Sequence, residues 1–487
     1  MEQYFKIGIS VFSLLIVQAC SEFPTSSTLP ADPSEALPGG KTTVHLRKPT
    51  FMAPLANLTL ERQDKFYLGL SFFRDPWVIA PSATTDRDGL GPLFNARACF
   101  ACHPRGGRGR TPSNIDEPML SMFLRLSIPG ENKKYGVIPE PVYGDQLQVR
   151  GITVKNSFGL ARKNGVAEGD GLIGEAHSYV EYETIRGSYA DGENWELRKP
   201  HYKIRDAAWG EMHPDTLFSP RLAPPLAGLG LLEAIDERDI LALADPEDKN
   251  NDHISGKANL VWDVVRGKTV LGRFGFKANQ PNLLQQTAAA FRGDIGITND
   301  LFKEQPCSER QIICQQAQNG LDSNSDVEIK RELLDAVTFF GRMLAVNKRR
   351  GENTPKVLAG RKLFYQANCK ACHTPGFTTI NNAAEPELAG QKIWPYSDLL
   401  LHDMGKGLAD GRPDFLATGS EWRTAPLWGL GLSQQVSGSK LYLHDGRARS
   451  LSEAILWHDG EAKTSRDYFI AMDKEKRQAL LAFVRSL

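Results

Sequence analysis

The spacing of apolar side chains predicts a mainly α-helical chain with one β-rich region in its N-terminal half. Apolar residues recur at helical intervals over residues 328–346 and on two segments near the C-terminus. Over residues 140–215, apolar and polar residues alternate instead, and Gly and Asp-Gly mark turns, which predicts β-hairpins. The two C-terminal segments carry their stripes at Val357, Gly360, Leu363 and Phe364 and at Leu480, Phe483, Val484 and Leu487.

The first 50 residues are expected to be an export signal followed by a tether. Residues 1–6 are short and include a Lys, residues 7–17 are apolar, and Val17-Gln-Ala-Cys20 resembles the cleavage box of a bacterial lipoprotein. Residues 1–19 would then be a signal peptide, and residues 20–50, rich in Ser and Pro, a tether behind an acylated Cys20. A plain signal peptide or a membrane anchor is the alternative, although the apolar run is short for a bilayer span. We therefore expect a periplasmic protein that is lipid-anchored to the outer membrane.

Length and charge narrow the classes of function. At 487 residues, the chain is long enough for two or more domains. Lys plus Arg and Asp plus Glu both number 58, so the net charge is zero. Without a basic surplus, nucleic acid is not an expected partner.

Two five-residue motifs carry the chemistry. They are Cys99-Phe-Ala-Cys102-His103 and Cys369-Lys-Ala-Cys372-His373. In this spacing each thiol can add to one vinyl group of the same haem, and the adjacent His can bind the iron from below the ring. A zinc knuckle would not require a His directly after each pair, and a thioredoxin-like motif would accompany a βαβ pattern, which is absent. The sequence therefore predicts two covalently attached c-type haems, with His103 and His373 as iron ligands.

The motifs divide the chain into two predicted cytochrome c-type haem domains. The first spans residues 51–345 and contains the β-rich insertion over residues 140–215. The second spans residues 350–487, where the helix before the motif and the terminal helix are expected to meet over the haem. The sequence has two further cysteines besides Cys20 and those of the motifs, Cys307 and Cys314. They are predicted to form a disulfide in an oxidising compartment.

One acidic loop offers a candidate calcium site. Asp248, Asn250 and Asp252 alternate in a way that could place oxygen ligands around Ca²⁺. His253, however, stands where a calcium loop prefers Gly, and no Glu follows at the expected distance. A solvated acidic turn is the equally weighted alternative.

Several stretches resemble a known family. They are GPLFN (91–95), GGRG (106–109), RLAPPLAGLGLLE (221–233), GFKANQ (275–280), YSDLLLHDMG (396–405), EWRTAPLW (421–428) and LHDGR (443–447). Together with the motifs, they resemble the bacterial di-haem oxidoreductase, putative peroxidase family, and more distantly the di-haem cytochrome c peroxidases. The resemblance implies that peroxide meets the N-terminal haem, that the C-terminal haem stores and relays an electron, and that calcium lies between them.

The resemblance also implies a second ligand for the C-terminal haem. Ser450 and Glu453 form a capping box that would begin a helix reaching His458. In the peroxidases this stretch supplies the distal ligand, usually Met, and His458 lies at the matching offset. Met404 and His402 are the fallback candidates, and a structural role for His458 is the alternative.

A catalytic acid/base is implied in the same way. Where the peroxidases place a Glu over the peroxide-binding face of the N-terminal haem, this chain has Asp294. Asp294 would move a proton between the peroxide oxygens as the O–O bond breaks. Alternatively, it caps a turn between Gly293 and Gly296. No His follows His103 before His177, so we expect the distal face of this haem to be open or held by a displaceable ligand.

The predicted function is therefore a di-haem oxidoreductase that activates a small oxidant, peroxide or O₂, and exchanges electrons with a redox partner protein. The rival is a non-catalytic di-haem electron-transfer lipoprotein that serves a partner or a metal-uptake system.

Overall fold

The computed structural model describes residues 31–152, 174–317, 319–321 and 325–487. The predicted signal peptide and Cys20 lie outside these ranges. The chain is 30% helix and 18% strand in small sheets, so it is not clearly mainly α and the predicted fold class is confirmed only in part. Many of the strands are only two to four residues long. Strands this short show no alternation in a sequence, because period two needs several residues to become visible.

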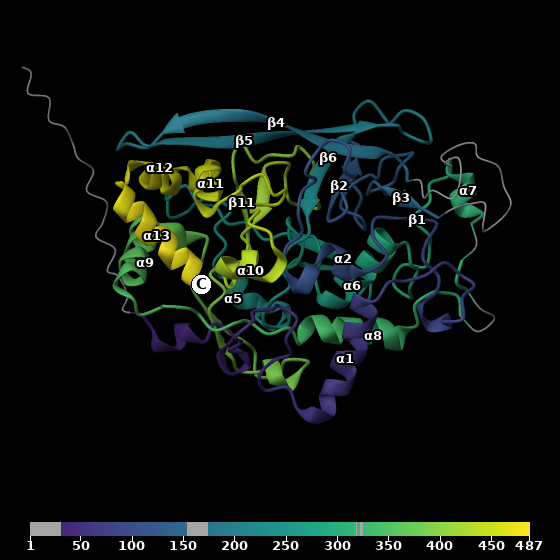
Figure 1. Ribbon diagram of the computed structural model, residues 1–487, viewed down its shortest axis with the longest axis horizontal. Helices are drawn as coiled ribbons and strands as arrows, with labels where there is room; N and C mark the ends of the chain where they lie inside the picture. The colour runs from purple at the N-terminus through teal and green to yellow at the C-terminus, as the bar shows by residue number, and fades with distance from the viewer. Residues whose placement is uncertain (1–30, 153–173, 318, 322–324) are drawn as a thin grey trace, which may run out of the picture.

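Two pairs of helices form the framework of the molecule. Helix α1 (Leu60–Arg74) packs against α8 (Arg331–Arg342), and α9 (Pro355–Gln366) packs against α13 (Lys474–Ser486), which confirms the expected meeting of the two C-terminal segments. The pairs lie in different halves of the molecule (Figure 1). Within the described ranges, the other α-helices are α2 (Cys99–Cys102), α4 (Leu229–Glu233), α5 (Glu237–Leu241), α6 (Leu283–Ala290), α7 (Ile312–Gln315), α10 (Ser433–Ser437), α11 (Leu451–Leu456) and α12 (Lys463–Ala471).

Both helix pairs cross at a glycine that lies against a carbonyl oxygen. A Cβ atom on Gly69 would lie 2.1 Å from the Ala336 oxygen, and one on Gly360 would lie 1.9 Å from the Ala479 oxygen. Any side chain at either glycine would therefore push the helices apart. The sequence pattern identifies Gly360 only as part of a stripe, whereas the packing shows why the residue must be small.

The aromatic residues one helical turn further on repeat the same arrangement. Phe73 lies 5.0 Å from Phe340, and Phe364 lies 5.2 Å from Phe483, measured between ring centroids. Each pair belongs to a separate hydrophobic cluster, one around α1 and α8 and the other around α9 and α13. The two halves thus contain helix pairs of similar construction, and a C-x-x-C-H motif follows the first helix of each pair.

All sheets within the described ranges are two-stranded and antiparallel. They pair β1 (Leu93–Phe94) with β3 (Arg150–Gly151), β2 (Met122–Ser127) with β6 (Leu217–Leu222), β4 (His177–Ser188) with β5 (Asn194–Arg205), β7 (Leu260–Asp263) with β8 (Lys268–Leu271), β9 (Phe377–Thr378) with β10 (Lys392–Ile393), and β11 (Leu401–Asp403) with β12 (Glu421–Arg423).

The long hairpin β4–β5 extends along one side of the molecule and covers both halves (Figure 1). Its base contacts the N-terminal half, where Arg205 forms an ion pair with Asp116. Its tip packs on the C-terminal half, where the ring of Tyr189 meets that of Phe469 edge-on. The hairpin lies in the region of predicted β structure, but it links the two halves and is not confined to the first.

The segment predicted as a tether is folded against the body from Asp32 onward. Glu35 is 2% exposed and forms ion pairs with Arg349 at 2.7 Å and Arg361 at 2.8 Å. It also accepts a hydrogen bond from the Tyr396 hydroxyl at 2.8 Å. The prediction of a tether over residues 20–50 is therefore wrong for its second half, because a buried carboxylate with three partners fixes that segment in place.

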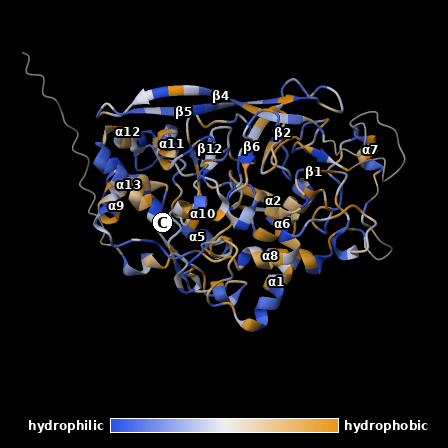
Figure 2. Cartoon of the chain, viewed as in Figure 1, coloured by the Kyte–Doolittle hydropathy of each residue, from blue (hydrophilic) through white to orange (hydrophobic). Residues whose placement is uncertain are grey.

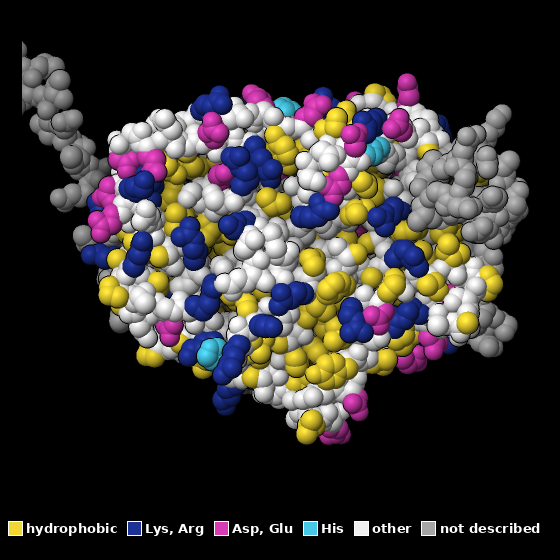
Figure 3. All heavy atoms as spheres, in the orientation of Figure 1, with side chains coloured by type: hydrophobic (Ala, Val, Ile, Leu, Met, Phe, Trp, Pro, Cys, Tyr) yellow, Lys and Arg dark blue, Asp and Glu magenta, His cyan; other side chains and the backbone are white. Residues whose placement is uncertain are grey.

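The surface and interior follow the usual separation of side chains. Figure 2 shows apolar residues on the inner helices α2, α6 and α8, and Figure 3 shows Lys and Arg side chains spread over the visible face.

Cys307 and Cys314 form a disulfide, as predicted. In the described ranges, no helix combines the length and apolar character needed to cross a membrane.

Candidate functional site

The first motif ends at a histidine whose ring is held by a backbone carbonyl. Cys99–Cys102 form the single turn α2, and His103 follows as its C-terminal cap. Nδ1 of His103 lies 2.8 Å from the Pro224 carbonyl oxygen. A carbonyl can only accept, so Nδ1 carries the proton and Nε2 keeps its lone pair. Burial lowers the pKa of His103 to about 4, so the ring is neutral and suited to bind a metal.

The second motif repeats this geometry. Nδ1 of His373 donates to the Tyr396 carbonyl oxygen at 2.9 Å, and burial lowers the pKa of His373 to about 4. The ring centroid of each motif histidine also lies 6.4 Å from that of a phenylalanine in the first helix of its pair, Phe73 of α1 for His103 and Phe364 of α9 for His373. Holding Nδ1–H on a carbonyl is the usual way in which a protein orients a histidine that binds a metal through Nε2.

The four motif thiols are free and partly buried. Burial raises the pKa of Cys99 and of Cys369 to about 12 and also raises those of Cys102 and Cys372. Thiols of this kind are poor redox nucleophiles near neutral pH. No group of three or more His, Cys, Asp or Glu in the described parts of the chain could hold a metal ion, which argues against the zinc knuckle.

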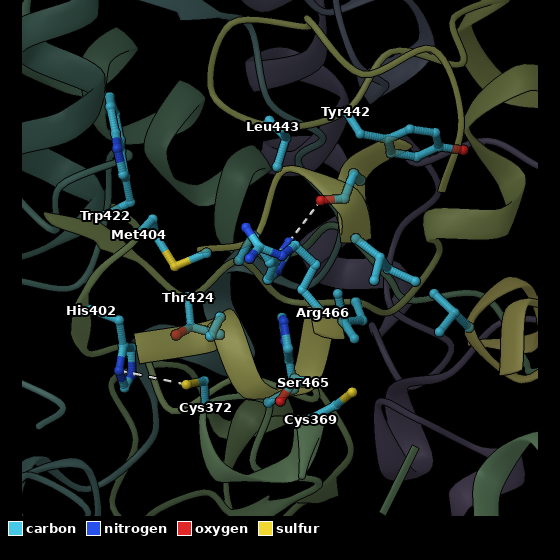
Figure 4. Close-up of a pocket in the computed structure, with 18 of the residues that line it drawn as sticks. Cys369, Cys372, His402, Met404, Trp422, Thr424, Tyr442, Leu443, Ser465 and Arg466 are labelled. Atoms are coloured by element: carbon cyan, nitrogen blue, oxygen red, sulfur yellow. Dashed lines mark hydrogen bonds between the residues drawn. The ribbon is translucent and has the colours of Figure 1, made fainter. Parts of the chain in front are cut away.

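A largely apolar cavity opens beside Cys369, Cys372 and His373 (Figure 4). These residues fit one edge of a haem: two thiols within reach of the ring edge, and an imidazole with a free Nε2 beside them. The other lining residues include Phe276, Phe364, Met404, Trp422, Leu443, Leu451, Ile455, Phe469, Leu480 and Val484. Such a lining suits a flat hydrophobic macrocycle.

His458 lies in the lining of this cavity, two residues beyond the end of helix α11. Ser450 caps α11 by accepting from the Glu453 amide, as predicted, whereas the Glu453 carboxylate accepts from the Arg449 amide instead of completing the box at Ser450. Nδ1 of His458 donates to the Ala454 carbonyl oxygen at 2.7 Å, so Nε2 keeps its lone pair. The position of His458 as a distal ligand stays a prediction.

The fallback ligand His402 is occupied on both nitrogens. Nε2 lies 2.8 Å from Asp398 and Nδ1 lies 2.7 Å from Glu461. Burial opposes protonation, but the hydrogen bonds to Asp398, Cys372 and Glu461 raise the pKa of His402 well above its usual range. A doubly hydrogen-bonded, protonated imidazole has no lone pair for iron. Met404, in contrast, lines the cavity and keeps its thioether available.

His444 is a cavity residue that sequence reasoning did not select. It is 5% exposed, its Nδ1 lies 3.0 Å from the Pro220 carbonyl oxygen, and its buried Nε2 has no hydrogen-bond partner. Its ring stacks on Trp422 with centroids 3.7 Å apart. The only signal in the sequence was its place in the LHDGR stretch, where neither its burial nor its stacking is visible.

Asp294 lies close to the first motif. It belongs to the single π-helical turn Phe291–Ile295, and its backbone oxygen accepts from the amides of Asn95 and Ala96, a few residues before Cys99. Burial raises the pKa of Asp294, and its charge in turn raises the pKa values of the motif thiols. Its Oδ1 accepts from Gln146 Nε2 at 2.8 Å. Single π-helical turns are frequent at functional sites.

Gln146 is a second residue of this site that sequence reasoning missed. Its Nε2 also donates to the Gly293 carbonyl oxygen, while its buried Oε1 has no hydrogen-bond partner. Gln146 and Asp294 are 148 residues apart in the chain, so no local pattern could have paired them.

The three candidate calcium ligands of the acidic loop each use one oxygen within the loop. Asp248 Oδ1 accepts from the His253 amide, Asn250 Oδ1 from the Asp252 amide, and Asp252 Oδ1 from the Ile254 amide. These oxygens close exposed turns of their own loop, and the described residues contain no cluster that could hold a metal ion. The geometry fits the solvated acidic turn, and the calcium site stays a prediction.

The molecule contains two similarly built helix pairs, and in each pair a C-x-x-C-H motif with an oriented histidine lies in the chain between the two helices. This arrangement is that of a protein with two haem sites. The chain belongs to the family described as di-haem oxidoreductase, putative peroxidase, whose family model matches residues 34–487. No curated protein matches it.

Among solved structures, the chain is similar to hydrazine synthase of Kuenenia stuttgartiensis, in a crystal pressurised with xenon. The two share 17% identity with a TM-score of 0.23, and the match covers 37% of this chain and 62% of that chain. A likeness this distant carries no functional argument.

Proposed function

We propose that the chain is a c-type di-haem oxidoreductase that activates peroxide at its N-terminal haem and stores an electron at its C-terminal haem. One haem would be attached at Cys99 and Cys102 and the other at Cys369 and Cys372. The observation that carries the proposal is the partly buried carboxyl group of Asp294, which lies next to a motif whose histidine has a free Nε2. A plain electron carrier has no need for a partly buried acid at that position.

His103 would bind the iron from the proximal side. Its Nδ1–H bond to the Pro224 carbonyl fixes the tautomer and ring plane and increases the basicity of Nε2. The haem supplies an iron that can bind peroxide and exchange single electrons. The protein has to keep the proximal histidine neutral, which its burial does.

Asp294 would hold and deliver the proton that peroxide cleavage requires. Its raised pKa keeps a larger protonated fraction than an exposed Asp has near neutral pH. Gln146 fixes Oδ1, so the carboxyl group needs little reorganisation as the proton moves. A positioned acid/base of this kind typically contributes about 10²–10⁴-fold in rate.

The C-terminal site fits the storage of an electron. His373 would be the proximal ligand and His458 the distal one, with both Nδ1 atoms held by backbone carbonyls. A redox partner protein would supply electrons, and we propose export to the periplasm with a lipid anchor in the outer membrane. Calcium is not part of the proposal, because the oxygens of the acidic loop are used within the loop.

The test is to mix the oxidised protein with hydrogen peroxide and to monitor the haem absorbance over time. The resting protein should show a high-spin band, which changes within the first turnover. The electron-transfer alternative instead requires two low-spin haems and no response to peroxide, and that result would overturn the proposal. Staining a denaturing gel for haem checks covalent attachment independently.

A further inference from the structure

Arg108 is a buried cation that lines the C-terminal cavity without an acidic partner. It is 6% exposed, and its Nη1 donates to the Leu443 carbonyl oxygen at 3.2 Å. Its Nε is buried and has no hydrogen-bond partner, and burial lowers the pKa of Arg108 to about 10. An isolated buried guanidinium is costly, so such a group usually faces an anion.

Arg423, on β12, lines the same cavity and also has no acidic partner. Its Nε donates to the Gly275 oxygen at 2.9 Å and its Nη1 to the Thr424 oxygen at 3.0 Å. Both acceptors are backbone carbonyls, and burial lowers the pKa of Arg423 to about 10. Over the described ranges, neither arginine forms an ion pair with a carboxylate.

The other charged side chains that line the cavity have ion-pair partners. Arg466 pairs with Asp459 at 3.0 Å and with Asp467 at 2.9 Å. Glu461 pairs with His402. The cavity therefore has an excess of positive charge at Arg108 and Arg423 and nowhere else among its described lining.

The position of Arg108 matches the chemistry of a haem. The vinyl groups and the propionate groups occupy opposite edges of the macrocycle, so thiols that hold the vinyl edge direct the propionates away from themselves. In Figure 4, Cys369 and Cys372 lie at one end of the cavity, and Leu443 and Tyr442 lie at the other. Arg108 contacts the Leu443 carbonyl, so its guanidinium lies at the end far from the thiols.

We propose that Arg108 and Arg423 bind the propionate carboxylates of the haem attached at Cys369 and Cys372. This inference rests on the proposed function, which places a haem in the cavity. Guanidinium groups suit carboxylates because they donate two parallel hydrogen bonds. Arg108 lies only five residues after His103, so the loop of the first motif supplies a binding residue to the second haem.

The direct test is the reduction potential of each haem in full-length Arg108→Gln protein. A cation beside the haem stabilises the reduced form, so its removal should lower the reduction equilibrium constant of the C-terminal haem by about tenfold or more, 59 mV for one electron. The potential of the N-terminal haem should stay unchanged. Protein with Cys369→Ala and Cys372→Ala, which retains only the N-terminal haem, identifies the two signals.

Arg110→Gln is the matched control, because Arg110 lies in the same loop but is exposed and pairs with Glu117. It should shift neither potential. Arg108→Lys keeps the charge and should recover most of the shift, which separates an electrostatic role from misfolding. Arg423→Gln should give a second downward shift at the same haem.

The outcomes distinguish this inference from the proposed function. If haem staining shows no haem on the C-terminal motif, the proposed function fails first. If haem is attached but Arg108→Gln changes neither potential, or changes only that of the N-terminal haem, the assignment of Arg108 is wrong.

Discussion

Replacing Glu35 by Ala tests whether the N-terminal segment helps to hold the C-terminal site together. Glu35 is buried between Arg349 and Arg361 and accepts from the Tyr396 hydroxyl, and the Tyr396 carbonyl in turn holds His373. The carboxylate therefore lies one residue away from the predicted iron ligand. Its loss removes the counter-charge of Arg349, whose side chain is only 3% exposed.

The expected loss of stability is large. Removing one partner of a buried, hydrogen-bonded ion pair typically costs about 3–5 kcal/mol, because the remaining charge stays buried. Native proteins have a total stability of roughly 5–15 kcal/mol. Glu35→Ala should therefore shift the denaturant midpoint strongly, whereas Glu35→Gln, which keeps the volume and one acceptor for Tyr396, should shift it less.

The assay is denaturant unfolding of the full-length protein, followed by both tryptophan fluorescence and haem absorbance. Hydrogen exchange over residues 33–44 reports the local effect, because this segment should open before the rest of the C-terminal half. Glu131→Ala, at an exposed loop position, is the control and should change little. If Glu35→Ala and Glu131→Ala gave the same midpoint and the same exchange, the buried network would not stabilise the protein and our reasoning would fail.

Three further predictions concern the haem sites and a buried acid. Asp294→Asn should leave both haems attached but slow the spectral response to peroxide by roughly tenfold or more in stopped flow, with exposed Asp116→Asn as control; equal rates would contradict an acid/base role. His458→Ala should convert one low-spin haem to high spin, and an unchanged optical spectrum would point to His444 or Met404 instead. Burial raises the pKa of Glu175 from 4.5 to about 8, so the stability associated with its protonated form is complete below pH 4.5 and is lost as the pH rises through 8. Glu175→Gln should flatten the pH dependence of unfolding across this window, and a slope equal to the wild-type slope would refute the shift.

The sequence alone determined the features whose geometry is local. The C-x-x-C-H motifs place two thiols and an imidazole within five residues, so their chemistry is readable without a fold. The same holds for the disulfide between Cys307 and Cys314 and for the cap at Ser450, where the partners lie seven and three residues apart. Helical stripes long enough to show their period predicted α9 and α13 and their contact.

Only the tertiary structure decided which groups meet across long separations. Glu35 reaches Arg361 over 326 residues and Arg108 reaches Leu443 over 335, and no periodicity links such positions. In the acidic loop, likewise, only the structure shows that Asp248 and Asp252 accept hydrogen bonds from amides of their own loop. Side-chain identity fixes what a group can do, but burial and long-range partners decide which groups are left free to do it, and these depend on how the whole chain packs.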